Sequence, residues 1–434
     1  MSATKRKVVS NLVWAVGGKI VTLVGNLLVG IFVARYLGPE QYGLMNYVIS
    51  YVALFQIFAT FGLDSIEIRE ESKTPERKDA IIGTAFRLKL VAATITIAFV
   101  ALTMFLFEAD GFTRLMVMMY SLSMLLNTMN VARNYFTSII WNEYVVKTEI
   151  SRTVIGIVFK VALLMLHAPL AWFIFAVLLD AVLLASGYAI SYRAKIGSMR
   201  LWSWDAPLAR YMLKQAFPML LSGAAVIVYT KINAVMLGNM LDKTAVGIYS
   251  IAVSFTDVCV FVPTILSQTI TPVLVRNYEQ DLEQYKAKAQ IFMNLSLWGC
   301  IIIAITVSLI SYPLIRYTYG VMYLASVPVL QVLVLRLAGV ALAQTSGQMI
   351  IVEHIQKWAV IRNLIGCAVC IGLNLVLIPR YGVMGAAVSS VITGLFPGFF
   401  ANMLIPAYRK IFVMQTVGIL TGWKDVYKIK TLLK

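Results

Sequence analysis

Twelve apolar stretches, each long enough to cross a lipid bilayer, follow one another through this sequence with short polar connections between them. The hydrocarbon core of a bilayer takes ~20 residues of α-helix. Because backbone groups in lipid must form their hydrogen bonds internally, apolar stretches of this length with short loops predict a helical bundle. Strands of a β-barrel would alternate in polarity over ~10 residues, and no such pattern occurs in the sequence. We therefore expect an all-α, polytopic membrane protein.

The connections contain residues that end helices or form turns, such as Gly38-Pro39 and Ala168-Pro169. With 60% hydrophobic and only 13% charged residues, the chain has little material for a soluble domain. The twelve transmembrane helices are expected at 9–34, 43–63, 82–107, 115–138, 150–167, 170–191, 213–236, 246–272, 289–311, 327–350, 359–378 and 384–406.

The two halves of the sequence share a short pattern. Leu37-Gly38 followed by Tyr42-Gly43 is similar to Leu237-Gly238 followed by Val246-Gly247. Such internal similarity is typical of transporters that hold a central site between two repeats. The parts we expect are an N-terminal six-helix lobe (1–210), a C-terminal six-helix lobe (211–406) and a basic amphipathic cytoplasmic tail (407–434) on the inner leaflet.

The positive charges predict the orientation. With a cytoplasmic N-terminus, the cytoplasmic segments hold 25 Lys and Arg residues, whereas the outer loops hold five. This bias follows the positive-inside rule, so we expect both termini in the cytoplasm. It also accounts for the net charge of +17 without a nucleic-acid partner. The hydrophilic segment from Asp64 to Asp79, which has nearly balanced charge, is expected on the same side.

Few side chains are suited to catalysis or metal binding. The four cysteines lie in apolar surroundings, and the two histidines, His167 and His354, have no metal-ligand spacing. No nucleophile–base set, carboxylate pair or glycine-rich phosphate loop stands out at a membrane surface. We expect a transporter without cofactor or metal, not an enzyme.

Several charged residues lie inside the expected helices, where a charge is costly and usually marks a transport pathway. Lys19 and Asn26 share one face of the first helix. Arg133 and Lys231 lie about five residues from a helix end, so their long side chains can also reach the interface. Arg336 lies about nine residues from the outer end of the tenth helix, too deep for easy snorkelling.

Asp257 belongs to a polar stripe on one face of the eighth helix, together with Ser250, Ser254, Thr264 and Gln268. The stripe favours a water-filled lumen, and the alternative is a polar seam between packed helices.

Lys160 and Asp180 lie on consecutive antiparallel helices at similar distances from the Ala168-Pro169 turn, so we expect them to form an ion pair. Lys19 and Arg336 then outnumber Asp257. The lumen is therefore expected to be cationic, which suits a phosphate or pyrophosphate.

Three segments carry a resemblance to a known family. Val33–Gly43 resembles the first-loop signature of Wzx-type polysaccharide (O-antigen) flippases of the multidrug/oligosaccharidyl-lipid/polysaccharide (MOP) exporter superfamily. Met236-Leu237-Gly238 with the downstream segment 246–249 is similar to the second-lobe counterpart of this signature. Asn374–Ala387 is similar to the signature that joins the last two helices.

The resemblance implies two six-helix lobes that work by alternating access. The implied activity flips undecaprenyl-pyrophosphate-linked oligosaccharides, such as O-antigen units of lipopolysaccharide, from the cytoplasmic to the periplasmic leaflet of the bacterial inner membrane. It further implies a cavity lined by the first, second, seventh and eighth helices, and possible coupling to protons or sodium. A polysaccharide polymerase and a chain-length regulator are implied partners.

For the implied cavity, the best-placed residues are Lys19, Asn26, Lys231 and Asp257, and Asp257 is the candidate for ion coupling. Relatives often have an acidic residue where this chain has Asn233, so the resemblance does not carry over a cation-coupling site on the seventh helix. Alternatives are a drug or cation exporter, which would favour acidic cavity residues, and a peptidoglycan-precursor flippase. A polytopic glycosyltransferase or polymerase would need a larger outer loop.

Overall fold

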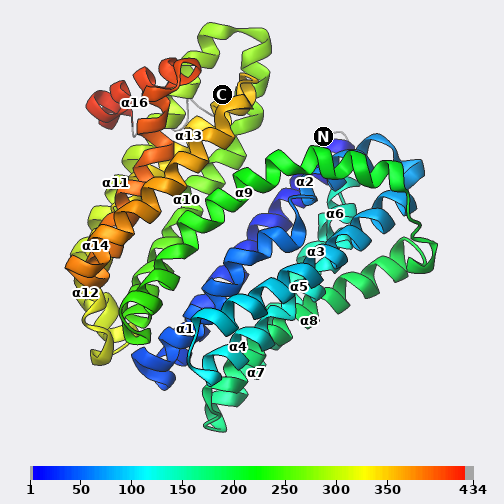
Figure 1. Ribbon diagram of the computed structural model, residues 1–434. Coiled ribbons are helices and arrows are strands. Elements are labelled where there is room, and N and C mark those ends of the chain that lie inside the picture. Colours follow the sequence, from blue (N-terminus) through cyan, green and yellow to red (C-terminus); the bar gives the residue numbers. More distant parts are fainter. Residues whose placement is uncertain (1–2, 426–434) are drawn as a thin grey trace. The chain divides into compact units, whose positions relative to one another are not determined.

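The computed structural model describes the backbone of residues 3–425 and the side chains of residues 22–425. Within that range the chain is almost entirely helical and contains no strand (Figure 1). Nine helical segments of the described residues are long and apolar enough to cross a membrane. The expectation of an all-α, polytopic membrane protein is therefore confirmed.

Contacts divide the chain into two compact units, an N-terminal unit (Met1–Ile227) and a C-terminal unit (Val228–Lys434). The helices of the N-terminal unit are α1 (Ala3–Thr60), α2 (Asp64–Lys73), α3 (Lys78–Phe107), α4 (Gly111–Ser121), α5 (Ser123–Leu126), α6 (Asn130–Ser138), α7 (Asn142–Met165) and α8 (Leu170–Lys195). Helix α9 (Ala206–Met240) contributes to both units. The helices of the C-terminal unit are α10 (Lys243–Gln280), α11 (Leu282–Thr318), α12 (Ser326–Leu333), α13 (Arg336–Val352), α14 (Ala359–Leu395), α15 (Ala401–Leu404) and α16 (Arg409–Thr421).

Each expected transmembrane span falls largely within helical backbone, but the spans are not twelve separate straight helices. The first and nearly all of the second lie within α1, which is broken at Gly38, where φ is 73° and ψ is 173°. The eleventh and the first half of the twelfth lie on either side of Gly382 in α14, where φ is 56°. Both angles lie in the left-handed region that glycine adopts without steric cost, so glycine permits each reversal.

The boundary between the units lies within α9, between Ile227 and Val228, whereas the sequence pattern predicts it at 210/211. The reason is that the first half of α9 packs onto the end of α1. A Cβ atom added to Gly62 would lie 2.8 Å from the backbone nitrogen of Leu220. This close contact keeps the start of α9 with the N-terminal unit.

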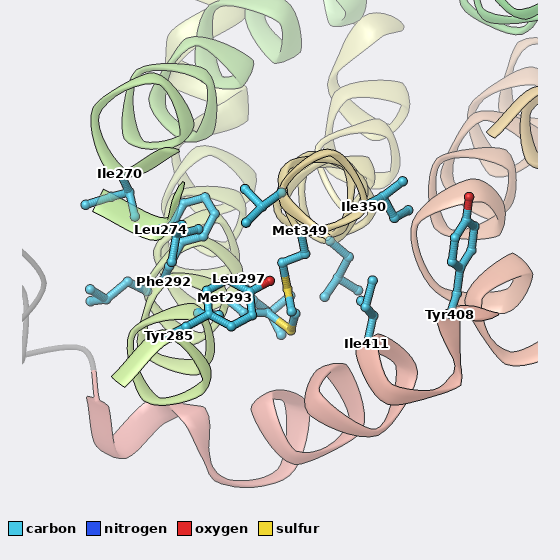
Figure 2. Packing of buried hydrophobic residues seen from close by; sticks show 14 of the residues in the cluster. Ile270, Leu274, Tyr285, Phe292, Met293, Leu297, Met349, Ile350, Tyr408 and Ile411 are labelled. Carbon is cyan, nitrogen blue, oxygen red and sulfur yellow. The ribbon is translucent and has the colours of Figure 1, made fainter. Parts of the chain in front are cut away.

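The core of the C-terminal unit extends to the tail segment. Figure 2 shows Ile411 of α16 beside Met349 of α13, in a buried cluster that also includes Leu274 and Phe292. Gln415 of α16 is buried and donates a hydrogen bond to the Gly398 carbonyl at 2.6 Å. The first part of the expected tail thus packs onto the protein, and residues 426–434 lie outside the described range.

Candidate functional site

A cavity of about 220 Å³ lies within the N-terminal unit, between α1, α7 and α8, which pack against one another. A single water needs only ~10–15 Å³, so the cavity can be hydrated. Its lining combines apolar side chains with a small polar set. The polar lining residues are Asn26, Tyr42, Arg152, Lys160 and Asp180.

Two cations in this lining share one carboxylate. The Lys160 Nζ lies 2.7 Å from the Asp180 Oδ2, and the Arg152 Nη1 lies 4.0 Å from the same oxygen. These three side chains therefore carry a net charge of +1. Among the described residues, the buried Arg152 Nε has no hydrogen-bond partner. The cluster can thus donate hydrogen bonds to an anion that enters the cavity.

A glycine allows the carboxylate to approach α7 closely. Gly156 lies one turn from both Arg152 and Lys160 on the same face of the helix. A Cβ atom at Gly156 would lie 2.3 Å from the Asp180 Oδ1. A larger residue at this position would push the Asp180 carboxylate away, so the absence of a side chain positions the ion pair.

The cavity confirms one expectation and adds one residue. Lys160 and Asp180 form the ion pair that the sequence predicts. The sequence does not mark Arg152 as a cavity residue, because Arg152 lies at the edge of the fifth expected helix, among the charges expected in the cytoplasm. The i, i+4, i+8 spacing of Arg152, Gly156 and Lys160 is the signal that would have found it.

The other sequence-predicted residues of the N-terminal unit lie in different surroundings. Asn26 is exposed and lines the cavity. The side chain of Lys19 lies outside the described range. Arg133 does not line the cavity, and its Nε lies 3.7 Å from the Glu149 Oε1 in a partly exposed ion pair. Exposed pairs of this kind contribute little to stability.

In the C-terminal unit, Asp257 and Arg336 form an ion pair with 2.8 Å between Oδ1 and Nη2. The Asp257 side chain is 55% exposed, whereas that of Arg336 is 14% exposed. The Arg336 Nε is buried and has no hydrogen-bond partner among the described residues. Lys231 is half-buried and makes no ion pair within the described part of the chain. Arg336 therefore keeps a free donor although its charge is partly balanced.

The polar stripe of α10 is not uniformly hydrated. Ser250 is buried, and the Thr264 hydroxyl accepts a hydrogen bond from the Gln344 amide at 2.9 Å. Asp257 and Gln268 are exposed. The stripe thus combines a seam between helices with exposed polar positions.

Asn233 belongs to a buried network of neutral side chains. Its amide donates to the Tyr249 hydroxyl at 3.0 Å and to the Ser390 hydroxyl at 2.5 Å, and it accepts a hydrogen bond from Asn374. This network contains no carboxylate to balance a bound cation. No group of three or more His, Cys, Asp and Glu suited to a metal ion occurs among the described residues.

Comparison with known proteins places the chain in a family. The sequence profile of the family described as "Polysaccharide biosynthesis protein" matches residues 8–278, which is more than half of the chain. No curated protein gives a significant sequence match.

Solved structures share the fold. An inward-facing multidrug resistance MATE family transporter of the MOP superfamily matches with a TM-score of 0.67 and 16% identity, over 94% of this chain and 96% of that chain. The lipid II flippase MurJ, in an inward closed conformation, matches with a TM-score of 0.67 and 15% identity, over 97% of this chain and 98% of that chain. A MOP superfamily transporter from Pyrococcus furiosus, whose binding pocket is described as having reverse polarity, matches with a TM-score of 0.55 and 15% identity. The match covers 99% of this chain and 97% of that chain. The chain therefore belongs to the polysaccharide biosynthesis protein family and has the fold of MOP superfamily transporters.

Proposed function

We propose that this protein is a flippase for lipid-linked oligosaccharides. Its substrate would be an undecaprenyl-pyrophosphate-linked glycan unit, such as an O-antigen repeat, moved from the cytoplasmic to the periplasmic leaflet by alternating access. The observation that carries the proposal is the cavity of about 220 Å³ in which Arg152 and Lys160 outnumber Asp180.

The chemistry of the substrate fits this charge balance. A pyrophosphate loses water and counterions when it leaves the membrane surface, and burying it without compensation is strongly unfavourable. Lysine and arginine offer charge-assisted hydrogen bonds that replace part of this hydration. The isoprenoid chain can remain in lipid throughout, so the protein has to shelter only the polar head.

The same charge balance argues against export of organic cations, since the carboxylates of Asp180 and Asp257 already lie against basic side chains. A peptidoglycan-precursor flippase would handle the same kind of pyrophosphate head, so the cavity supports it as the alternative. Under either proposal the protein lies in the inner membrane with both termini in the cytoplasm. A polysaccharide polymerase and a chain-length regulator would act on the flipped product.

The proposal can be tested in proteoliposomes. Lipid-linked glycans with a fluorophore on the sugar are incorporated, and an impermeant reductant bleaches those that have reached the outer leaflet. We expect this protein to accelerate bleaching of an undecaprenyl-pyrophosphate oligosaccharide over that in protein-free vesicles. Unchanged bleaching with both an O-antigen-type unit and a lipid II analogue, together with transport of an organic cation dye, would contradict the proposal.

Arg336 provides a prediction in the C-terminal unit. Arg336→Gln is expected to reduce glycan flipping while leaving membrane insertion intact, because the buried Nε and the guanidinium charge are lost. Lys19→Ala is expected to have the same effect on the basis of its position in the sequence. Surface glycan, measured with a lectin in cells that lack the native gene, gives the readout at matched protein levels.

The double variant Asp257→Asn/Arg336→Gln separates two roles of Arg336. If Arg336 only neutralises Asp257, removing both charges restores export to the level of the wild type. If Arg336 contacts the substrate, the double variant stays as impaired as Arg336→Gln. The second result is the one we expect, and full restoration would rule Arg336 out as a substrate-binding residue.

A further inference from the structure

A carboxylate lies buried in the N-terminal unit without a partner. Glu71 of α2 is 1% exposed. Neither of its side-chain oxygens has a hydrogen-bond partner among the described residues. The nearby Ser138 hydroxyl of α6 faces Glu71, but it donates its hydrogen to the Tyr135 carbonyl at 2.8 Å. An ionised carboxylate in this position would be shielded from water, and the Ser138 hydroxyl could stabilise it only by giving up its hydrogen bond to the Tyr135 carbonyl.

The neighbouring ammonium group is already engaged. The Lys89 Nζ of α3 lies 2.6 Å from the Glu67 Oε1 and 2.7 Å from the Asp64 Oδ1. The Asn134 amide of α6 donates to both of these carboxylates. Glu67 and Lys89 are fully buried, whereas the Asp64 side chain is 47% exposed. The positive charge of Lys89 is thus balanced before Glu71 is counted.

The other groups that face Glu71 do not neutralise it. Glu67, one turn earlier on α2, is a like charge. Tyr135 of α6 and Tyr192 of α8 lie within electrostatic reach and carry no charge near neutral pH. The carboxyls of Glu67 and Glu71 therefore compete for one lysine, which contacts Glu67.

A buried carboxyl without a counter-charge takes up a proton, because the neutral acid needs far less solvation than the carboxylate. We propose that Glu71 is a proton-binding site whose occupancy is linked to the packing of α2 against α3 and α6. While α2 is packed, the carboxyl keeps its proton. When α2 moves away and water enters, the O–H bond breaks and the proton passes to water.

This inference rests on the proposed function in one respect, namely that the N-terminal unit changes conformation during transport. It assigns the coupled ion as a proton and places it at Glu71 rather than at Asp257, whose carboxylate is exposed and paired with Arg336. Linkage is reciprocal, so a conformational change that releases the proton must itself depend on pH.

The first test needs no substrate. Infrared spectra of the purified protein in lipid nanodiscs should show, at neutral pH, a carboxylic-acid C=O band that disappears in Glu71→Gln. Glu76→Gln, which changes an exposed glutamate after α2, is the matched control and should retain the band. If the wild type and Glu71→Gln had the same carboxylic-acid C=O absorption, Glu71 would be ionised, and the proposal would be overturned. Glutamine replaces the protonated acid with a neutral isostere, so the variant should fold.

The second test measures the linkage. Amide hydrogen exchange of α2, corrected for the intrinsic effect of pH, reports how often this helix opens. Because the packed form would hold one proton that the open form releases, opening should become roughly tenfold more favourable for each unit of rising pH. The dependence should vanish in Glu71→Gln and remain in Glu76→Gln. Equal dependence in both variants would disprove the linkage, even if glycan flipping is also observed.

Discussion

Lys89→Met is expected to destabilise the N-terminal unit by roughly 3–5 kcal/mol, because the fully buried Glu67 carboxyl loses its counter-charge and must then either stay ionised or take up a proton, both of which cost free energy. Methionine fills a similar volume, so the loss arises from the missing charge and not from a cavity. Thermal unfolding of the purified protein in detergent, followed by circular dichroism, measures the change.

Two further variants identify the cause. Glu67→Gln combined with Lys89→Met removes both buried charges and should recover most of the lost stability. Lys147→Met breaks an ion pair with Glu143 in which both side chains are about half exposed, and it should change stability by less than ~1 kcal/mol. If Lys89→Met were no more destabilising than Lys147→Met, the buried ion pair would not stabilise the fold.

The fold could be predicted from the sequence because the bilayer imposes helices on long apolar stretches. The breaks at Gly38 and Gly382 occur in connections that turn residues mark in the sequence. The division of the chain within α9 could not be predicted, since it depends on the contact between Gly62 and Leu220. Hydropathy shows where a helix crosses the membrane but not which neighbour it packs against.

The candidate site could be predicted only in part. The Lys160–Asp180 ion pair follows from two antiparallel helices joined by a short turn, because the two residues lie at similar distances from that turn and so at similar depths in the membrane. The sequence does not predict the cluster of Glu67, Glu71 and Lys89, because the two glutamates lie in a hydrophilic segment expected in the cytoplasm and Lys89 lies in the third expected span. Only tertiary packing of α2 against α3 and α6 buries these charges.

The charge of the cavity leads to the prediction with the largest expected effect on function. Lys160→Met lowers the net charge of Arg152, Lys160 and Asp180 from +1 to zero. A hydrogen bond to a charged group contributes ~1.5–3 kcal/mol, and each 1.4 kcal/mol is tenfold. We therefore expect flipping of the pyrophosphate-linked glycan to fall roughly tenfold to a hundredfold at limiting substrate. The fluorescence bleaching assay in proteoliposomes measures this rate.

The double variant Lys160→Met/Asp180→Asn decides whether charge or structure is responsible. It leaves Arg152 without a competing carboxylate and so returns the net charge to +1. If the cavity binds an anion, the double variant should flip the glycan faster than Lys160→Met alone, and Lys160→Arg should stay close to the wild type. If the ion pair only stabilises the packing of α7 on α8, flipping in the single and double variants should simply follow their thermal stability, and Lys160→Met should lose flipping only as far as it loses stability. In that case the loss would appear in thermal unfolding, and the proposal that the pyrophosphate enters this cavity would fail.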